Sequence, residues 1–154
     1  MDCRSIQFSV DKALIDYPQL QALFNRTAFW AKERQISDLE TAIAYSNPVV
    51  TVWNQKALIG FARATSDGIY RAVIWDVVID PRFQGAGLGR KLVETVLAHP
   101  AVNKVERVYL MTTHQQSFYE RIGFESNPTT TMVLQNQSLE TDFAGTLIWE
   151  SVSS

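Results

Sequence analysis

The sequence predicts a single α/β domain, and three observations lead to this prediction. First, 154 residues with 46% hydrophobic side chains suffice for one domain with a proper core and are too few for two ordinary ones. Second, the residue patterns predict one strand, two helices and a hairpin ahead of segment 74–97, and a further strand and helix after it. Third, that segment, IWDVVIDPRFQGAGLGRKLVETVL, is typical of a strand that enters a helix through a glycine-rich loop.

Within this central segment, residues 74–79 are mostly β-branched or aromatic, which favours a strand. His99 precedes Pro100 and is therefore disfavoured in the helical conformation, so the helix is expected to end there. Apolar residues recur at helical spacing between the loop and this end and predict one buried face, namely Leu88, Leu92, Val93, Val96 and Leu97.

Local patterns also predict the elements ahead of this segment. Ile6–Val10 alternates apolar and polar residues as a half-buried strand does. Tyr17-Pro18 opens a helix, and Ser37-Asp38-Leu39-Glu40 is a capping box for a second helix that runs to about Ser46. A hairpin and one further strand follow, with strands at Val49–Trp53, Ala57–Thr65 and Arg71–Ile79 and turns at Asn54-Gln55-Lys56 and Ser66-Asp67-Gly68.

The elements after the segment are shorter. Val105–Met111 is expected to be a strand, and Thr113–Ile122 a helix with a capping box at Thr113 and Gln116 and with Gly123 at its C-terminal cap. Thr129–Leu134 and Thr146–Val152 have the composition of strands. We therefore expect residues 1–154 to form one domain whose last 20 residues or so are a C-terminal strand extension.

Composition excludes several classes of function. A net charge of −2 argues against a general affinity for nucleic acid or acidic membranes. The single Cys3 cannot form an internal disulfide, and its place near the N-terminus makes a catalytic thiol a poor interpretation. There is no apolar run approaching 18 residues and no signal-peptide pattern. A soluble, cytoplasmic protein is expected, with small-molecule or protein partners and no metal, and a homodimer is one assembly left open.

The glycine loop has the chemistry of an anion site. Gly85, Gly87 and Gly89 lack the Cβ atoms that would hold a ligand away from the main chain, and the following helix begins with unpaired N–H groups. Arg90 and Lys91 oppose the helix dipole, which a bound polyphosphate would offset. The alternative is a plain strand-to-helix turn with two solvated basic residues.

The spacing of the glycines limits which class of phosphate ligand the loop can bind. The sequence does not match the P-loop pattern, which needs lysine at position 90, or the dinucleotide-binding pattern, which needs glycine there; this chain has Arg90. The pattern that fits is Q-x-x-G-x-G, from Gln84 to Gly89, preceded by Val78-Ile79-Asp80-Pro81. It resembles the acetyl-coenzyme A pyrophosphate loop of the GNAT superfamily of N-acetyltransferases.

A second pattern supports this resemblance. Phe118-Tyr119-Glu120-Arg121-Ile122-Gly123-Phe124 matches a further GNAT motif in the expected place, although such a tyrosine by itself is usually a packing residue. The resemblance covers roughly residues 6–134 and implies a central sheet of mixed antiparallel and parallel strands flanked by about four helices. It also implies that Tyr119 lies near the sulfur of the coenzyme.

Within the superfamily, Gly60–Asp67, Ile74–Val77 and the loop are similar to the plastid GNAT proteins of plants and their cyanobacterial and algal relatives. That lineage is described both as serotonin (arylalkylamine) N-acetyltransferases and as protein lysine or N-terminal acetyltransferases. Because the N-terminus does not look like a transit peptide, a cyanobacterial or plastid-encoded relative fits better. Thr112 departs from the superfamily, where many members carry an asparagine that contacts the cofactor.

The resemblance implies a mechanism in which an acetyl group moves directly from acetyl-coenzyme A to a primary amine in a ternary complex. Tyr119 is the expected general acid, because its ordinary pKa of about 10 is near that of a thiol. Asp76 is a candidate base if a bulge re-aims it toward the cleft, with a structural role or water alone as the alternatives. The expected cofactor residues are Val77, Val78, Ile79, Gln84, Gly85, Ala86, Gly87, Leu88, Gly89, Arg90, Thr112 and Tyr119.

The resemblance, together with the distribution of aromatic residues, favours a small acceptor. Phe29, Trp30, Trp53, Tyr70 and Trp75 occur on segments expected near the cleft, and apolar walls bind rings. Trp30, Trp75 and Arg63 are the expected substrate residues. We expect an arylalkylamine such as serotonin or tryptamine as the acceptor, with a protein lysine or N-terminus as the alternative. A non-catalytic acyl-coenzyme A-binding regulatory domain and a binder of another phosphate ligand remain further alternatives.

Overall fold

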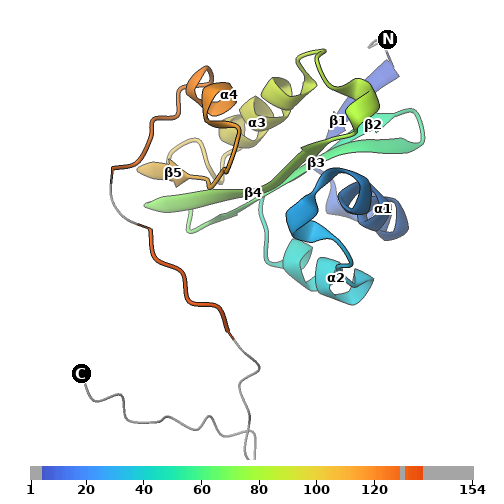
Figure 1. The fold of residues 1–154 in the computed structure, drawn as a ribbon, viewed down its shortest axis with the longest axis horizontal. Helices are drawn as coiled ribbons and strands as arrows, with labels where there is room; N and C mark the ends of the chain where they lie inside the picture. The colour runs from blue at the N-terminus through green and yellow to red at the C-terminus, as the bar shows by residue number, and fades with distance from the viewer. Residues whose placement is uncertain (1–4, 129–130, 137–154) are drawn as a thin grey trace, which may run out of the picture. The chain divides into compact units, whose positions relative to one another are not determined.

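The computed structural model describes residues 5–128 and 131–136, and the chain divides into two units, residues 1–124 and 125–154. The first unit contains the regular elements (Figure 1). Its strands are β1 (Ile6–Ser9), β2 (Val49–Asn54), β3 (Ala57–Ser66), β4 (Arg71–Ile79) and β5 (Arg107–Tyr109). Its α-helices are α1 (Tyr17–Thr27), α2 (Ile36–Ala44), α3 (Leu88–Ala98) and α4 (Gln116–Glu120), and its 3-10 turns are η2 (Lys12–Leu14), η3 (Phe29–Ala31) and η4 (Pro81–Phe83).

The sheet follows chain order, β1-β2-β3-β4-β5, with antiparallel pairing up to β4 and parallel pairing between β4 and β5. The parallel ladder joins Arg71, Ala72 and Val73 to β5, and it does not extend along the rest of β4. Among the described residues, the carboxyl half of β4 therefore has no strand partner on the side of β5 and presents a free main-chain edge there. A mixed sheet of this kind is what the sequence analysis expects.

Helices cover both faces of the sheet, with α1 and α2 on one face and α3 and α4 on the other (Figure 1). The apolar face of α3 packs on β2, β3 and β4, and Leu92, Val93 and Val96 are fully buried there. On the opposite face Leu20, Leu23 and Phe24 of α1 are buried, and the ring of Phe24 meets Phe61 of β3 edge to face at 5.4 Å. Residues of β4 therefore pack against both layers, with Ile74 and Ile79 in the α3 cluster and Val78 in the α1 cluster.

The predicted central segment is confirmed, since β4 ends at Ile79 and α3 runs from Leu88 to Ala98. The capping boxes are wrong. Helix α2 begins at Ile36, one residue before the predicted cap Ser37, and the residue that caps it, Gln35, makes no side-chain bond to the helix. Helix α4 begins only at Gln116, and the hydroxyl of Thr112, not that of Thr113, accepts the N–H of Gln115 at 3.0 Å.

Strand β5 is shorter than Val105–Met111, because only three of those residues pair with β4. Of the C-terminal strands, residues 131–134 carry no strand, and Thr146–Val152 lies outside the described residues. Within the described ranges, no helix combines the length and hydropathy needed to span a bilayer. The same ranges contain no cluster of three or more His, Cys, Asp or Glu side chains placed to hold a metal ion.

Candidate functional site

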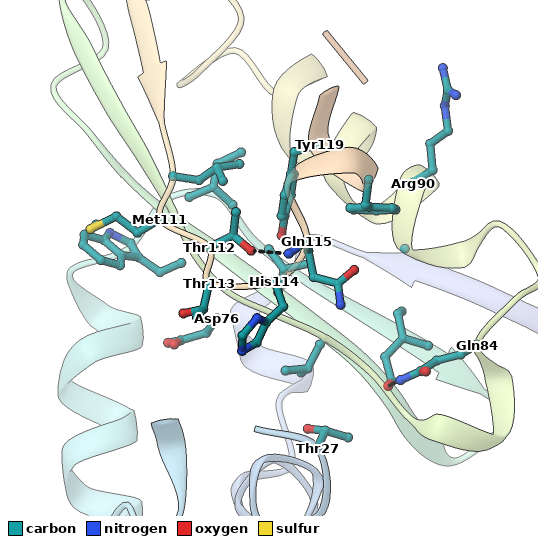
Figure 2. Close-up of a pocket in the computed structure, with 18 of the residues that line it drawn as sticks. Thr27, Asp76, Gln84, Arg90, Met111, Thr112, Thr113, His114, Gln115 and Tyr119 are labelled. Carbon is teal, nitrogen blue, oxygen red and sulfur yellow. Dashed lines mark hydrogen bonds between the residues drawn. The ribbon is translucent and has the colours of Figure 1, made fainter. Parts of the chain in front are cut away.

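A cleft of about 1300 Å³ opens where the ladder between β4 and β5 ends. Consecutive residues of β4, from Ile74 to Ile79, line it, as does the glycine loop. Figure 2 shows that Gln84 and Arg90 lie at one end of the cleft and Asp76 and Met111 at the other, with Tyr119 and His114 between them. The free edge of β4 therefore connects the loop to the opposite end of the cleft.

The glycine loop is shaped by left-handed backbone. Gly85 has φ 84° and Gly87, which caps α3, has φ 78°. A Cβ added at either position would meet no atom within 4 Å, so both glycines face open space. Gly89 differs, because a Cβ there would lie 3.4 Å from the ring of Phe118. Two glycines thus leave room for a ligand beside the start of α3, and the third allows α4 to approach.

Asp80 anchors the entrance to this loop. Its side chain is 1% exposed and accepts hydrogen bonds from the N–H and guanidinium of Arg82 and from the guanidinium of Arg26. Hydrogen bonding by Arg82, assisted by Arg26, lowers the pKa of Asp80 to about 2. Gln84 also donates to the carbonyl oxygen of Ile79 at 3.1 Å. Hydrogen bonds from Arg82 and Gln84 therefore hold the start of the loop against the end of β4.

A β-bulge re-aims Asp76. Phe61 pairs with Val78 and Arg63 with Trp75, so two residues of β4, Asp76 and Val77, stand opposite the single residue between Phe61 and Arg63. Asp76 has φ 58°, a left-handed conformation that aspartate tolerates better than most residues. The bulge breaks the alternation of the strand and allows Trp75, Asp76 and Val77 to line the same cleft.

The Asp76 carboxylate is held by donors from distant segments. Its Oδ2 accepts from Nη1 of Arg34 at 3.0 Å and from Nε of Arg63 at 2.8 Å, and its Oδ1 accepts from Nε1 of Trp30 at 3.2 Å. Burial alone would raise the pKa of Asp76, but the hydrogen bonds and charges of the two arginines outweigh it and hold the pKa below its usual range. Asp76 therefore stays ionised and already accepts three hydrogen bonds.

Tyr119 projects from α4 on the far side of the cleft. Its ring meets Phe118 at 4.9 Å and Phe124 at 5.8 Å, both edge to face. Burial raises the pKa of the phenol above its ordinary value, so the hydroxyl keeps its proton at neutral pH. Figure 2 shows the hydroxyl end of Tyr119 directed toward the segment from Thr112 to Gln115. The arrangement offers a proton donor close to the middle of the cleft.

Some cleft residues were not predicted. The hydrogen bond from the guanidinium of Arg34, within the 28–36 segment expected to contribute to the substrate walls, to Asp76 was also not predicted, because 42 residues separate the two in the chain. His114 and Gln115 line the cleft directly after β5. The available signal was their place as polar residues following the carboxyl end of a parallel strand, where ligands commonly bind.

The expected site residues fall almost entirely on this cleft. Asp76, Tyr119 and the expected substrate residues Trp30, Arg63 and Trp75 line it. So do these expected cofactor residues: Val77, Val78, Ile79, Gln84, Gly85, Gly87, Gly89, Arg90 and Thr112. The side chain of Leu88 instead joins the core, and exposed Ala86 does not line the cleft.

Two of the five aromatic residues expected near the cleft lie elsewhere. Trp53 packs against the α1 layer and bonds Thr51 through its indole N–H. Tyr70 is exposed in the turn between β3 and β4. The expectation for these two was wrong, because the side chain of Trp53 faces the α1 layer and Tyr70 lies in the turn before the amino end of β4.

Comparison with known proteins identifies the fold and the family. The family described as "Acetyltransferase (GNAT) domain" matches residues 39–126. Among solved structures, a protein from Xanthomonas campestris assigned to the GNAT family has a TM-score of 0.74 and 26% identity, covering 84% of this chain and 93% of its own. The ribosomal-protein-S18-alanine N-acetyltransferase of Escherichia coli, at 17% identity and a TM-score of 0.66, covers 79% of each chain and shows the fold alone.

Curated relatives have varied names. "Histone acetyltransferase TAP1" of Glycine max is 36% identical, covering 74% of this chain and 54% of the relative. "Serotonin N-acetyltransferase 2, chloroplastic" of Oryza sativa subsp. japonica is 33% identical, covering 74% and 58%. "Uncharacterized N-acetyltransferase ycf52" of Pyropia yezoensis is 35% identical, covering 64% and 59%. The chain spans about half the length of the curated relatives it matches. The glycine loop, the bulged β4 and the family match together show that this chain belongs to the GNAT acetyltransferase family.

Proposed function

We propose that this chain transfers an acetyl group from acetyl-coenzyme A to a primary amine, directly and within a ternary complex. The observation that supports this most is the continuous path from the glycine loop, along the free edge of β4, to Tyr119. The fit of the coenzyme rests on Gly85 and Gly87, where a side chain would fill the open space that a pyrophosphate needs. Acetyl-coenzyme A would supply the acetyl group as a thioester.

Different segments of the chain would bind different parts of acetyl-coenzyme A. The N–H groups of the loop and of the first turn of α3 would bind the pyrophosphate, since both are aimed at a position that attracts negative charge. Arg90 lies in that turn and pairs with Glu94, at 2.6 Å, on the exposed side of the helix. Main-chain groups of Val77, Val78 and Ile79 would pair with the extended arm of the coenzyme and polarise the thioester carbonyl.

Tyr119 would act as the general acid that protonates the departing thiolate. Burial raises the pKa of the phenol, so Tyr119 still holds its proton when the thiolate forms, and transfer of that proton depends on the position of the hydroxyl beside the thiolate. Asp76 is a weaker candidate for the base, because a carboxylate held by Arg34 and Arg63 attracts a proton poorly. We assign Asp76 to positioning: it orients Trp30 and both arginines around the acceptor end of the cleft. Deprotonation of the amine would then fall to water or to His114, which lies in the cleft.

The proposed acceptor is a small arylalkylamine such as serotonin or tryptamine, and a protein lysine or N-terminus is the second candidate. Phe29, Trp30 and Trp75 supply aromatic walls at the acceptor end, which supports a ring-bearing substrate. The names of the relatives include both a serotonin and a histone acetyltransferase, so they support either acceptor. The chloroplastic relatives support a place in the plastid stroma, and the resemblance stated from the sequence leaves the cytoplasm of a cyanobacterium as the other proposed location.

A turnover assay tests the proposal. Release of free coenzyme A and formation of the acetylated product are followed for tryptamine, serotonin, a polyamine and a lysine-bearing peptide. We expect acetylation, with a kcat/KM for the arylalkylamines above that for the peptide. A higher kcat/KM for the peptide would transfer the assignment to protein acetylation. Tight acetyl-coenzyme A binding without turnover of any amine would point to a non-catalytic binding domain.

A further inference from the structure

The acceptor end of the cleft carries more positive than negative charge. Arg34 and Arg63 line it with side chains 32% and 18% exposed, and both bind the same Oδ2 atom of Asp76. Asp76 is the one carboxylate among the described residues that line the cleft. The three side chains together therefore present one net positive charge to whatever binds beside them.

The arginines retain free donor capacity, whereas Asp76 retains little acceptor capacity. A guanidinium has five N–H donors. Arg34 uses one nitrogen, Nη1, on Asp76, while Arg63 uses Nε on Asp76 and Nη1 on Ser46 at 3.2 Å. The carboxylate of Asp76 is 5% exposed and already accepts from Trp30 and both arginines. The site is thus equipped to bind an additional anion and poorly equipped to bind a cation.

This charge is separate from the proposed phosphate end. In Figure 2 Asp76 lies across the cleft from Gln84 and Arg90, with Tyr119 between them. Aromatic rings also lie beside Arg34 and Arg63. The guanidinium of Arg63 lies 5.9 Å from the centre of the Trp75 ring, and the indole N–H of Trp30 donates to Asp76, which binds both arginines. An acceptor that places a ring between Trp30 and Trp75 would bring a substituent of that ring to the arginines.

We infer that the acceptor is an aromatic primary amine that carries a carboxylate on its ring or side chain, and that Arg34 and Arg63 bind this carboxylate. The inference rests on the proposed acetyl transfer, and it changes the preferred acceptor from serotonin or tryptamine, which have no carboxylate, to an arylalkylamine that carries one. Arginine forks match a carboxylate with two parallel, charge-assisted hydrogen bonds.

A matched pair of substrates tests the inference: 2-phenylethylamine and 4-(2-aminoethyl)benzoate, which differ by one carboxylate. We expect kcat/KM to be at least about tenfold higher for the benzoate at low salt. In Arg34→Gln the advantage should shrink to about threefold or less, and Arg34→Lys should restore part of it. Arg34 is the better target, since Arg63 is more buried and also holds Ser46. The control is Arg71→Gln, which removes the same charge from an exposed pair with Glu106 outside the cleft.

Equal values of kcat/KM for the two amines, or a preference for the benzoate that survives in Arg34→Gln, would overturn the inference. Calorimetry with phenylacetate and its neutral counterpart phenylacetamide, in the presence of coenzyme A, separates this failure from failure of the proposed function. Phenylacetate should bind wild type at least about tenfold more tightly than it binds Arg34→Gln, and phenylacetamide should not distinguish them. If neither amine is acetylated but phenylacetate binds wild type more tightly than Arg34→Gln, the anion site is confirmed and the proposed acetyl transfer is wrong. If phenylacetate binds both proteins equally, the anion site is wrong whatever the activity.

Discussion

Gly87→Ala is the substitution that best isolates the role of the loop main chain. Gly87 has φ 78°, and an added Cβ meets no atom of the protein within 4 Å. The unfolding free energy of the unbound protein should therefore fall only by the strain of a left-handed alanine, about 1–2 kcal/mol. For a chain of this size that corresponds to a fall in Tm of roughly 2–8 °C.

The cost to the bound state should be additional. The new Cβ would occupy the space in which the pyrophosphate is proposed to lie, so the affinity for acetyl-coenzyme A should fall by at least about tenfold, or 1.4 kcal/mol. Isothermal titration calorimetry measures this loss, and thermal unfolding of the free protein measures the strain. Both are needed, because backbone strain alone could lower the concentration of folded protein.

The chain offers a matched control in Gly68→Ala. Gly68, in the turn between β3 and β4, has φ 79°, its added Cβ also meets nothing within 4 Å, and it does not line the cleft. We expect the same fall in Tm and an unchanged affinity for acetyl-coenzyme A. If the two variants bind acetyl-coenzyme A equally well, whether at the wild-type level or equally weakened, the loop does not hold the pyrophosphate by close main-chain approach.

Three other substitutions probe the chemistry and the anchors of the cleft. Tyr119→Phe should lower kcat by about 10²–10⁴ with little change in acetyl-coenzyme A affinity, and any fall in rate at high pH should vanish; retention of half the wild-type kcat would exclude a general acid. Asp76→Asn keeps a residue that tolerates φ 58° but removes the negative charge that neutralises Arg34 and Arg63. It should cost roughly 3 kcal/mol of unfolding free energy and leave the pH midpoint of kcat/KM unchanged, whereas a shifted midpoint would restore Asp76 as the base. Because the folded-state pKa of Asp80 is depressed to about 2, its ion pairs stabilise the protein above pH about 4 and are lost as the pH falls from about 4 toward 2. Asp80→Asn should therefore lower the free energy of unfolding at pH 7 by about 1–2 kcal/mol and flatten its dependence on acid; an unchanged acid dependence in denaturant titrations would contradict this.

The sequence by itself determined the features whose causes are local. The spacing of Leu88, Leu92 and Val96 specifies one buried face of a helix, and Gly87 permits the left-handed residue that starts it. Alternation, turn residues and β-branched runs likewise predicted four of the strands to within about a residue. The glycines of the loop indicate an anion site for the same reason, whereas the cleft residues on β4 were expected from the resemblance to the GNAT superfamily.

Only the tertiary structure decided what depends on partners far away in sequence. No local pattern predicts the bulge at Asp76, because it arises from a mismatch of register between β3 and β4. Nor does any pattern pair Asp76 with Arg34, since α1, α2 and their connection must first dock on the sheet. The same packing turned Trp53 into a structural residue and Trp30 into a cleft residue, although both are tryptophans near predicted element ends. The charge at the acceptor end is therefore a property of the assembled fold, because it depends on how many arginines reach one buried carboxylate.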